Sequence, residues 1–456
     1  MDVKISSCTG FALPVLLLSV ALTACGDKTT TSGAPLAVTL ARYNATGAPG
    51  TPDTSFGTQG VVTTDVNGSQ DDIAFAVVVQ PVDGKIIAVG SSFTAPASIV
   101  VIRYNANGTL DSTFGSNGNG ITVTSLPSAD ASAFAATLDS NGKLLVAGRS
   151  AASSGASGFF LLRYNTAGAP GTPGTLDTGF GTGGIVTTAI PSGSATSGNA
   201  IALSGTNILV AGQSLIGVRF VIALAQYTSS GALDSTFGSG GIVTTPIGSL
   251  DAAAAALAVQ PQDGKIVVAG LAGNAFNVWD AALLRYNANG TLDLPFGGTN
   301  TGMVITDIGS SSNYANAVAL QADGKIVVAG NAFANPSANT SDIAVLRYNT
   351  DGTLDTDPTT GFGGGTGIVT TSIGAFDNGF AVAVQTDNKI VVAGNADAGV
   401  GDRLALLRYN ANGSLDSGFG TGGIVSRAAS GPSIITGAFG VALQPSDGAI
   451  VVVGYD

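Results

Sequence analysis

Aspartate supplies most of the side chains in this sequence that could do chemistry. All 29 acidic residues are Asp, and the chain contains no His. Paired carboxylates serve glycosidases as acid and as base or nucleophile. The lack of His excludes Ser-His-Asp and Cys-His catalysis, together with metal sites built on His. Because most of the Asp residues recur with a repeat, we expect them to be structural, and we predict no catalytic residue, no metal site and no cofactor.

Oxygen ligands for calcium are a second possibility. Segments 287–293 and 349–355 carry Asn, Asp and Thr at alternating positions, with Asp357 near the second segment. Calcium prefers several carboxylates, whereas most copies of this segment offer neutral Asn with one Asp. An Asn-Gly turn, in which the Asp bonds the loop backbone, explains the pattern better. We expect the recurring Arg to pair with that Asp or with loop carbonyls and to bridge neighbouring units.

Aromatic residues offer a third kind of chemistry, because segment 271–280 holds the only Trp of the chain. Phe276 and Trp279, which precede Asp280, have the size and shape to stack on a sugar or to seat a peptide side chain. The alternative is that Trp279 fills a gap between neighbouring units. We take Phe276, Trp279 and Asp280 as the candidate ligand contacts.

A repeat positions all of these residues. Its most regular copy, residues 260–270, begins with Asp263-Gly264, whose glycine suits the positive φ of a tight type I′ hairpin. The apolar run 266–269 that follows is short and β-branched, which indicates a strand buried on both sides. Arg-Tyr-Asn and Phe-Gly recur with it at intervals of about 60 residues. Versions of the strand motif return at 83–90, 141–148, 205–212, 323–330, 387–394 and 447–454.

Each repeat contains four predicted strands. Strand A is small and apolar (380–385), strand B is the motif above, strand C ends in Arg-Tyr-Asn (342–349), and strand D is Gly-Ile-Val-Thr-Thr (367–371). Alanine-rich strands suit the crowded axis where units converge, and Thr-rich strands suit a wet edge. Four antiparallel strands per unit, repeated seven times, predict an all-β fold, a seven-bladed β-propeller with four-stranded antiparallel blades. An open array of repeats is the alternative.

The two ends of the chain complement each other. The repeat region, residues 36–456, starts with strands C and D and finishes with strands A and B. Together they complete a closing blade shared between the N- and C-terminal ends, which removes the exposed edges of an open array. In this antiparallel order the A–B turns and C–D loops lie on one face. The B–C and D–A loops carry nearly all of the variability and lie on the other face, where binding is usually found.

The repeat resembles the bacterial delta-60 repeat family through Asp-Gly-Lys-Ile-Val-Val-Ala-Gly, Arg-Tyr-Asn, Gly-x-Leu-Asp and Phe-Gly. The resemblance covers residues 36–456 and departs from the pattern at 206–207, Asn388 and Ala449. Asn388 takes the place of the turn glycine, and Asn is the next best residue for a left-handed backbone. The resemblance implies a propeller fold and an envelope or secreted setting, and it implies no catalytic residues.

Residues 1–24 resemble the signal peptide of a lipoprotein. Lys4 precedes an apolar stretch, 11–22, that is short for a membrane span, and residues 22–25 (Leu-Thr-Ala-Cys) resemble the lipobox of bacterial lipoproteins. The resemblance implies a diacylated Cys25 at the new N-terminus, and residues 25–35 then form a flexible tether. An ordinary secretory signal is the alternative. We expect a lipid anchor in the bacterial cell envelope, at the outer membrane or cell surface rather than the cytoplasmic membrane.

The net charge of the chain limits the classes of partner that it can bind. The formal net charge is −12, and most of the 17 Lys and Arg residues occupy two fixed repeat positions. This argues against nucleic acid, because phosphate contacts need clustered Lys and Arg. We expect a monomeric, non-catalytic scaffold that binds an envelope protein or a glycan through the variable face. The alternative is an Asp- or calcium-dependent polysaccharide hydrolase or lyase acting at the propeller channel.

Replacement of the lipobox cysteine tests the predicted anchor. Cys25→Ser should release the protein from the membrane fraction or leave an unprocessed precursor, because a serine hydroxyl does not replace the thiolate that accepts the lipid. Cell fractionation and metabolic labelling with palmitate measure the two effects. Labelled palmitate that fails to appear on the wild-type protein would contradict lipidation.

Overall fold

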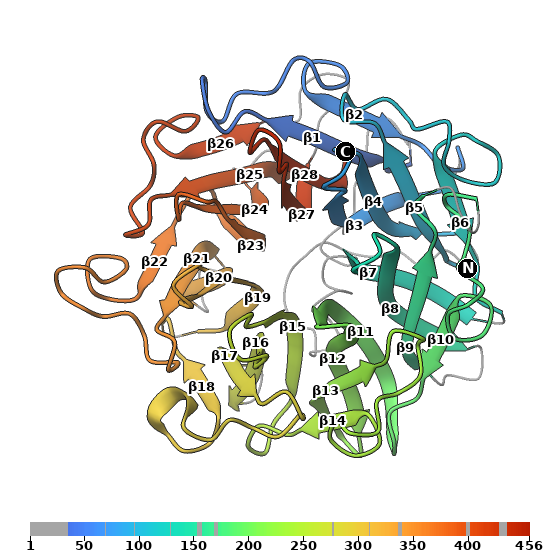
Figure 1. The fold of residues 1–456 in the computed structure, drawn as a ribbon. Helices are drawn as coiled ribbons and strands as arrows, with labels where there is room; N and C mark the ends of the chain where they lie inside the picture. The colour runs from blue at the N-terminus through green and yellow to red at the C-terminus, as the bar shows by residue number, and fades with distance from the viewer. Residues whose placement is uncertain are drawn as a thin grey trace, which may run out of the picture.

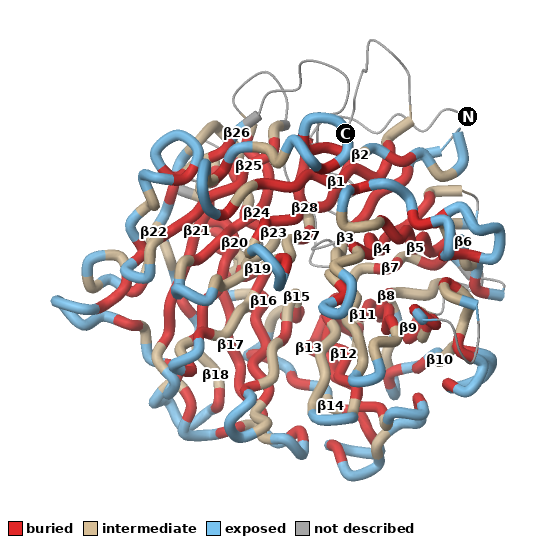
Figure 2. Tube along the Cα trace, turned by 45° about the horizontal axis from the view of Figure 1, so that its top comes forward, coloured by how far each residue is buried: buried red, intermediate tan, exposed pale blue. Residues whose placement is uncertain are grey.

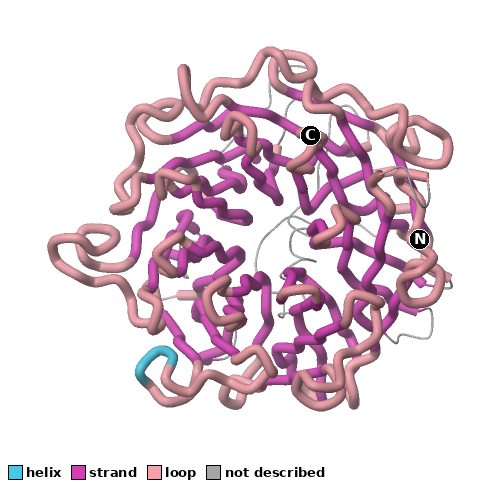
Figure 3. Tube along the Cα trace, viewed as in Figure 1, coloured by secondary structure: helices cyan, strands magenta, loops and turns pink. Residues whose placement is uncertain are grey.

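The computed structural model describes residues 35–456 except 69, 95, 128, 153–156, 168–171, 276–277, 310, 336–339, 398–401 and 428–435. Regular structure in this part of the chain is β-strand (Figure 3), apart from one 3-10 turn, η1 (Phe296–Gly298). No described helix is long and apolar enough to cross a membrane. The predicted all-β fold is confirmed.

The strands fall into four sets according to their place in each sheet. The innermost strands, predicted as strand A, are β3 (Asp72–Val79), β7 (Ala129–Leu138), β11 (Gly193–Ser204), β15 (Ala252–Val259), β19 (Asn313–Leu320), β23 (Phe376–Val384) and β27 (Gly437–Leu443). The second strands are β4 (Ile86–Ser92), β8 (Leu144–Ala152), β12 (Asn207–Ile216), β16 (Ile266–Ala275), β20 (Ile326–Asn335), β24 (Ile390–Asp397) and β28 (Ile450–Tyr455). The third strands are β1 (Val38–Tyr43), β5 (Ser98–Tyr104), β9 (Ser157–Tyr164), β13 (Arg219–Tyr227), β17 (Val278–Tyr286), β21 (Thr340–Tyr348) and β25 (Asp402–Tyr409). The outermost strands are β2 (Val61–Thr64), β6 (Ile121–Thr124), β10 (Ile185–Thr188), β14 (Ile242–Thr245), β18 (Met303–Thr306), β22 (Ile368–Thr371) and β26 (Ile424–Arg427).

Antiparallel four-stranded sheets are the building unit, as predicted. Four of them run in chain order, β3 to β6, β7 to β10, β11 to β14 and β15 to β18. An eight-stranded sheet joins β19–β22 to β23–β26 through one parallel residue pair, Ser341 and Phe376. The last sheet, β2-β1-β28-β27, takes strands from both ends of the chain, with Val38 opposite Tyr455. In Figure 1 the sheets stand around a common centre with the innermost strands nearest to it, which is the arrangement of a β-propeller.

Burial follows the order of the strands. Every residue of β4 and of β28 is buried, as expected for the strand-B motif. The outermost β6 has only half-buried and exposed residues, as its Thr content suggested. Figure 2 shows the same gradient, with buried strands in the body and exposed loops at the rims. We therefore call each four-stranded unit a blade.

The A–B turns differ from the expected type I′ hairpin. Gly264 has a φ of +71°, but Asp263 does not share the left-handed backbone that a type I′ turn requires of both central residues. Gln260 N donates to Lys265 O at 2.8 Å and Gly264 N donates to Gln260 O at 2.9 Å, so residues 261–264 form a longer loop. Asn388, which replaces the turn glycine in another blade, has a φ of +64°, as expected.

A β-bulge in each innermost strand lies opposite the glycine that ends the neighbouring strand. In β15 and β16 the register shifts between Ala254 and Ala256, and Ala254 pairs with Gly270. A Cβ atom on Gly270 would lie 2.0 Å from the carbonyl oxygen of Ala253. Close backbone approach at the bulge therefore explains the glycine that ends the strand-B motif. The same close approach, between 1.7 and 2.0 Å, recurs at Gly90, Gly148, Gly212, Gly330, Gly394 and Gly454.

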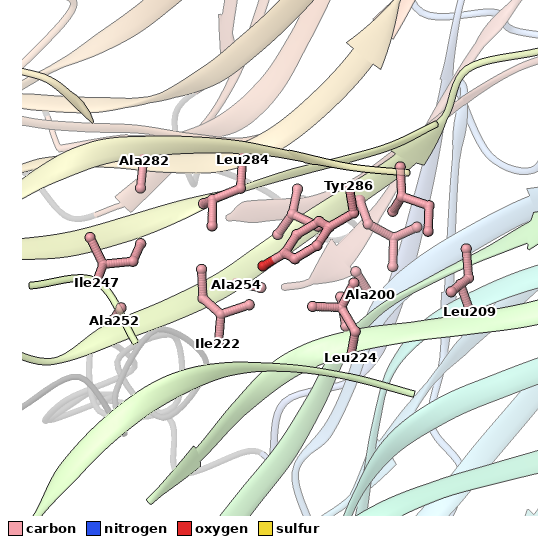
Figure 4. Packing of buried hydrophobic residues seen from close by; sticks show 14 of the residues in the cluster. Ala200, Leu209, Ile222, Leu224, Ile247, Ala252, Ala254, Ala282, Leu284 and Tyr286 are labelled. Carbon is pink, nitrogen blue, oxygen red and sulfur yellow. The ribbon is translucent and has the colours of Figure 1, made fainter. Parts of the chain in front are cut away.

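Neighbouring blades pack through apolar side chains that one blade alone cannot bury. Figure 4 shows the cluster between β11–β14 and β15–β18, where Ile222 and Leu224 meet Ala254 and Tyr286. The Tyr286 hydroxyl also donates to Thr245 Oγ1 of the preceding blade at 2.8 Å. This bond between blades explains why the Tyr of Arg-Tyr-Asn and the last Thr of strand D recur together in the repeat. Equivalent bonds join Tyr104 to Thr64, Tyr164 to Thr124, Tyr227 to Thr188, Tyr348 to Thr306 and Tyr409 to Thr371.

Gly270→Ala tests the close approach at the bulge. The added methyl group must displace the Ala253 carbonyl, so we expect the free energy of unfolding to fall by about 1–3 kcal/mol. Gly309→Ala is the matched control, because Gly309 is exposed and a Cβ there meets nothing within 4 Å. The control should stay within about 0.5 kcal/mol of wild type. Urea denaturation measures both, and equal stability of the two variants would show that the bulge accommodates a side chain.

Candidate binding face

The charged residues of the repeat bond to one another on the face of the A–B turns. Asp355 Oδ2 accepts hydrogen bonds from Arg347 Nε at 2.7 Å and from Lys325 Nζ at 2.8 Å. Arg347 also donates to the carbonyl oxygen of Ala411 in the next blade, and its guanidinium covers the Phe362 ring at 4.9 Å. The expectation that this Arg pairs with the Asp and with a loop carbonyl is confirmed. The Arg joins one blade to the next.

One blade keeps the geometry of this contact without the cations. Gln226 replaces the Arg, and its Nε2 donates to Asp234 at 2.9 Å. Asn207 replaces the Lys, and its Nδ2 donates to the same carboxylate at 2.8 Å. Hydrogen bonding around the Asp is therefore the property that this blade shares with the others. Arg–Asp pairs in other blades are Arg42–Asp53, Arg103–Asp111, Arg163–Asp177, Arg285–Asp293 and Arg408–Asp416.

These contacts shift the pKa values of the carboxyl groups. Partial burial raises the pKa of Asp355, but hydrogen bonds and charge from Lys325 and Arg347 outweigh it and hold the pKa below its usual value. Such carboxylates are ionised and already engaged at neutral pH, which suits a structural ion better than a proton donor. A similar balance, with the partners outweighing burial, lowers the pKa of Asp111, Asp177, Asp293 and Asp416.

The oxygen atoms of the Asn-Gly turns are also engaged. Asn289 Oδ1 accepts hydrogen bonds from Thr291 N at 3.1 Å and Thr291 Oγ1 at 2.7 Å. In the more acidic copy, Asp351 Oδ1 accepts from Thr353 N at 2.9 Å and Thr353 Oγ1 at 2.7 Å. Within the described ranges, no group of three or more His, Cys, Asp or Glu residues could hold a metal ion. The turn interpretation accounts for these contacts.

The B–C and D–A loops meet on the opposite face, as the strand order predicted. Phe220 N at the start of β13 donates to Asp251 Oδ1 at 2.7 Å in the loop before β15. Trp279 N in β17 donates to Ser312 Oγ at 3.3 Å in the loop before β19. Each bond joins the end of a B–C loop to the D–A loop that follows. We call the face formed by these two kinds of loop, for instance 217–218 and 246–251, the loop face.

The predicted ligand contacts fall on this face where the structure describes them. Phe276 and the lipid site Cys25 lie outside the described residues. The half-buried Trp279 ring stacks on Tyr314 of the next blade, with 6.3 Å between centroids and 30° between planes. Tyr314 meets the Phe333 ring edge-on at 6.0 Å and 78°. We call these three residues the aromatic trio. Trp279 thus packs between two blades, as the structural alternative proposed, while part of its surface stays exposed.

Asp280 is buried at the base of the B–C loop rather than exposed on it. Its Oδ2 accepts a hydrogen bond from Asn274 Nδ2 at 2.7 Å, which ties the two sides of the loop together. Its Oδ1 is buried and has no hydrogen-bond partner in the described structure. The side chain therefore shapes the loop that presents Trp279.

A second aromatic group escaped the sequence analysis. Phe75, Phe134, Phe380 and Phe439 occupy the bulge position of β3, β7, β23 and β27. Phe75 lies 5.6 Å from Phe134 and 5.2 Å from Phe439, which lies 5.1 Å from Phe380, measured between ring centroids. We call these four residues the phenylalanine row. The signal in the sequence was a Phe between two small residues, Ala or Gly, at one fixed place in strand A.

The sequence of the repeat is similar to a known family of repeats. Six segments match the model of a family described as "Domain of unknown function (DUF5122) beta-propeller", namely residues 83–114, 140–170, 207–237, 262–296, 321–357 and 385–419. The matches are spread across the chain and support an uncharacterised β-propeller repeat family. The search of curated proteins found no significant match.

Solved structures with a similar backbone include enzymes and other proteins. One is a catalytically inactive virginiamycin B lyase from Staphylococcus aureus with quinupristin, at 13% identity and a TM-score of 0.44, covering 91% of this chain and 99% of the other. A PL25 ulvan lyase gives 12% identity and a TM-score of 0.42, with 78% and 85% covered. Sqt1 from Chaetomium thermophilum gives 13% identity and a TM-score of 0.41, with 84% and 93% covered. At these similarities the three likenesses favour neither an enzyme nor a binding protein.

Proposed function

We propose that this chain is a non-catalytic binding propeller of the delta-60 type, which holds a protein or a glycan on its loop face. The observation that carries the proposal is the aromatic trio, three half-buried rings at the blade boundary where the loops depart from the repeat. Rigid aromatic rings supply much of the energy of binding sites at little cost in conformational entropy. On the opposite face, by contrast, the repeated charges bond to one another.

We propose further that the folded body is a monomer anchored to the cell envelope, at the outer membrane or cell surface, through a lipid on Cys25. The support is the apolar segment 11–22, the lipobox-like residues 22–25 and the polar tether that follows. A tether of this composition would let the loop face turn toward partners some distance from the membrane.

We also propose that seven blades close into a ring through the sheet β2-β1-β28-β27. Arg408 donates to Ala45 O at 2.8 Å and Gly420 N donates to Pro49 O at 2.9 Å, which repeats the contacts between other neighbouring blades. The sheet also shares one apolar cluster with β24 and β25 and another with β4 and β5. These contacts on both sides support a ring without exposed edges.

Removal of residues 437–456 tests closure. The deletion strips β27 and β28 from the shared sheet and exposes the edge of β1, so we expect an unfolded or self-associating protein. The matched control is a circular permutant that joins the two ends by a short linker and opens the chain at the exposed Gly248. The permutant should melt within a few degrees of wild type, since it keeps every strand pair. A soluble, monomeric truncation with wild-type melting would count against closure.

Trp279→Ala tests the binding function. Loss of a central aromatic contact should weaken the main partner found by a glycan array or an envelope pull-down by about thirtyfold, while folding is preserved. Val218→Ala is the control, because Val218 is 90% exposed on the same face and makes no part of the trio. The pull-down is repeated with a chelator. A mutant that retains every partner, while chelator or an Asp substitution abolishes turnover of a polysaccharide, would favour the hydrolase or lyase alternative.

A further inference from the structure

The phenylalanine row packs in part on a buried cluster of Ile73, Phe75 and Tyr455, but this packing does not require a phenyl ring in every blade. At the bulge position the innermost strands carry Phe, Asn or Ala, and Ala255 of β15 shows that a methyl group satisfies the fold. The four Phe come from β23, β27, β3 and β7, which are adjacent around the centre in Figure 1. Adjacent aromatic rings where a methyl group suffices point to a contact surface.

Part of this surface remains open. Phe134, Phe380 and Phe439 are half-buried, and only Phe75 is buried, at 6% exposure. Consecutive rings meet at interplanar angles of 79°, 41° and 49° rather than in a closed stack. The row is therefore a rigid aromatic platform, held by the innermost strands of four neighbouring blades.

Two of the three other bulge residues, Asn199 and Asn316, are amides that already have partners. Asn199 Nδ2 donates to Ala254 O at 2.8 Å, and Asn316 Nδ2 donates to Gly379 O at 3.0 Å. Each bond runs to the following blade and fixes the polar side of the centre. Four of the bulge residues are thus aromatic, and the other three are polar or small.

Arg149 lies on β8, next to β7, the innermost strand that carries Phe134 at one end of the row. It pairs with Ser132 in the β7–β8 ladder, two residues before Phe134. It shares a face of β8 with Leu145 and Ala147, which pack on the next blade. Its Nε is buried without a hydrogen-bond partner, and no ion pair joins its guanidinium to a described carboxylate. A partly buried cation without a partner is costly, so it needs an explanation.

Gln213 is a second buried polar side chain, one blade further on, and it shares a face of β12 with Leu209 and Ala211, which pack toward β15–β18. It holds the place in β12 that Arg149 holds in β8, since Gln213 pairs with Ser197 as Arg149 pairs with Ser132. Gln213 is 2% exposed, and its Oε1 has no hydrogen-bond partner in the described structure. Arg149 faces β11–β14 and Gln213 faces β15–β18, so the two side chains lie at different blade boundaries, and only Arg149 lies beside the row.

We propose that the phenylalanine row and Arg149 form a binding site for a saccharide that carries a carboxylate, such as a uronic acid unit of a polysaccharide. The apolar face of the pyranose ring lies on the half-buried phenyl rings, and the guanidinium donates to the carboxylate. This inference rests on the proposed binding function and deepens it, because it names the ligand class and moves the contact from the trio to the innermost strands.

Other ligand classes leave part of the site unused. Nucleic acid needs clustered cations, and this chain has a net charge of −12. A neutral sugar uses the rings but gives Arg149 no counter-ion, and an apolar peptide gives Arg149 no partner. A saccharide with a carboxylate satisfies the rings and the cation together.

The test is calorimetric titration of the full-length protein at about 0.15 M salt with hexasaccharides of the galacturonate, mannuronate, guluronate and glucuronate types, and with their methyl esters. We expect Arg149→Gln to weaken binding of the free acid by about tenfold or more and to leave the uncharged ester unchanged. Phe380→Leu and Phe439→Leu should each weaken acid and ester alike by about threefold to tenfold. Phe439→Tyr keeps the ring and should keep the affinity.

The controls for this inference, and the results that would contradict it, differ from those of the binding proposal. Arg219→Gln removes an exposed arginine of the loop face and should change nothing, and melting temperatures show that each variant is folded. The inference is overturned if no uronate binds below about 1 mM, if acid and ester bind the wild type equally, or if a hexa-aspartate peptide binds as tightly. Binding that is lost in Trp279→Ala but kept in the row variants would also overturn it, and would support the proposed function. Failure of both the array and the pull-down would instead remove that function.

Discussion

The bond from the recurring Arg to a carbonyl of the following blade is the polar contact that joins neighbouring blades at six junctions. The Asp holds the guanidinium through Nε and the Phe ring covers its face, so that a terminal nitrogen reaches the next blade, as Arg347 reaches Ala411. A blade alone leaves this donor without a partner, which couples the folding of neighbours. Where Gln226 replaces the Arg, its amide ends at Asp234. The apolar cluster of Figure 4 and the bond from Gly238 N to Asn289 O, at 2.9 Å, hold that junction.

The bulge in the innermost strand constrains the residue type at one repeat position and leaves it free at another. It forces a glycine at the end of the neighbouring strand, because a Cβ at Gly330 would lie 1.7 Å from the Tyr314 carbonyl oxygen. The inserted residue itself has no partner in the ladder, so its side chain is not set by the sheet. That freedom explains why one repeat position holds Phe380, Asn316 and Ala255 in different blades. A chain built from near-identical units acquires its individual features at such positions.

Much of this arrangement was predictable from the sequence, and the limits have physical causes. The strand order and the pairing of Arg with Asp followed from composition and spacing, since both are local to one repeat. The type I′ turn was wrong, because the hydrogen bond that closes the turn joins Gln260 to Lys265, so the loop spans residues 261–264 and only Gly264 has a positive φ. The stacking of Trp279 on Tyr314 joins two repeats, and only the register of the blades brings them together. The phenylalanine row joins four repeats, and a Phe between two small residues in one strand does not show which rings meet.

The two faces also differ in how their acids contribute to stability. On the turn face the pKa of Asp355 is lowered, so its contribution is present above the unfolded value of about 3.9 and is lost as pH falls through the folded value. On the loop face burial raises the pKa of Asp72 and of Asp377, so ionisation costs stability at neutral pH and the cost disappears as pH falls. Asp72 and Asp377 lie three residues before Phe75 and Phe380 on the same strands. Two of the four strands that carry the row, β3 and β23, thus also hold a partly buried carboxylate whose ionisation costs stability, and local costs of this kind are found at functional sites.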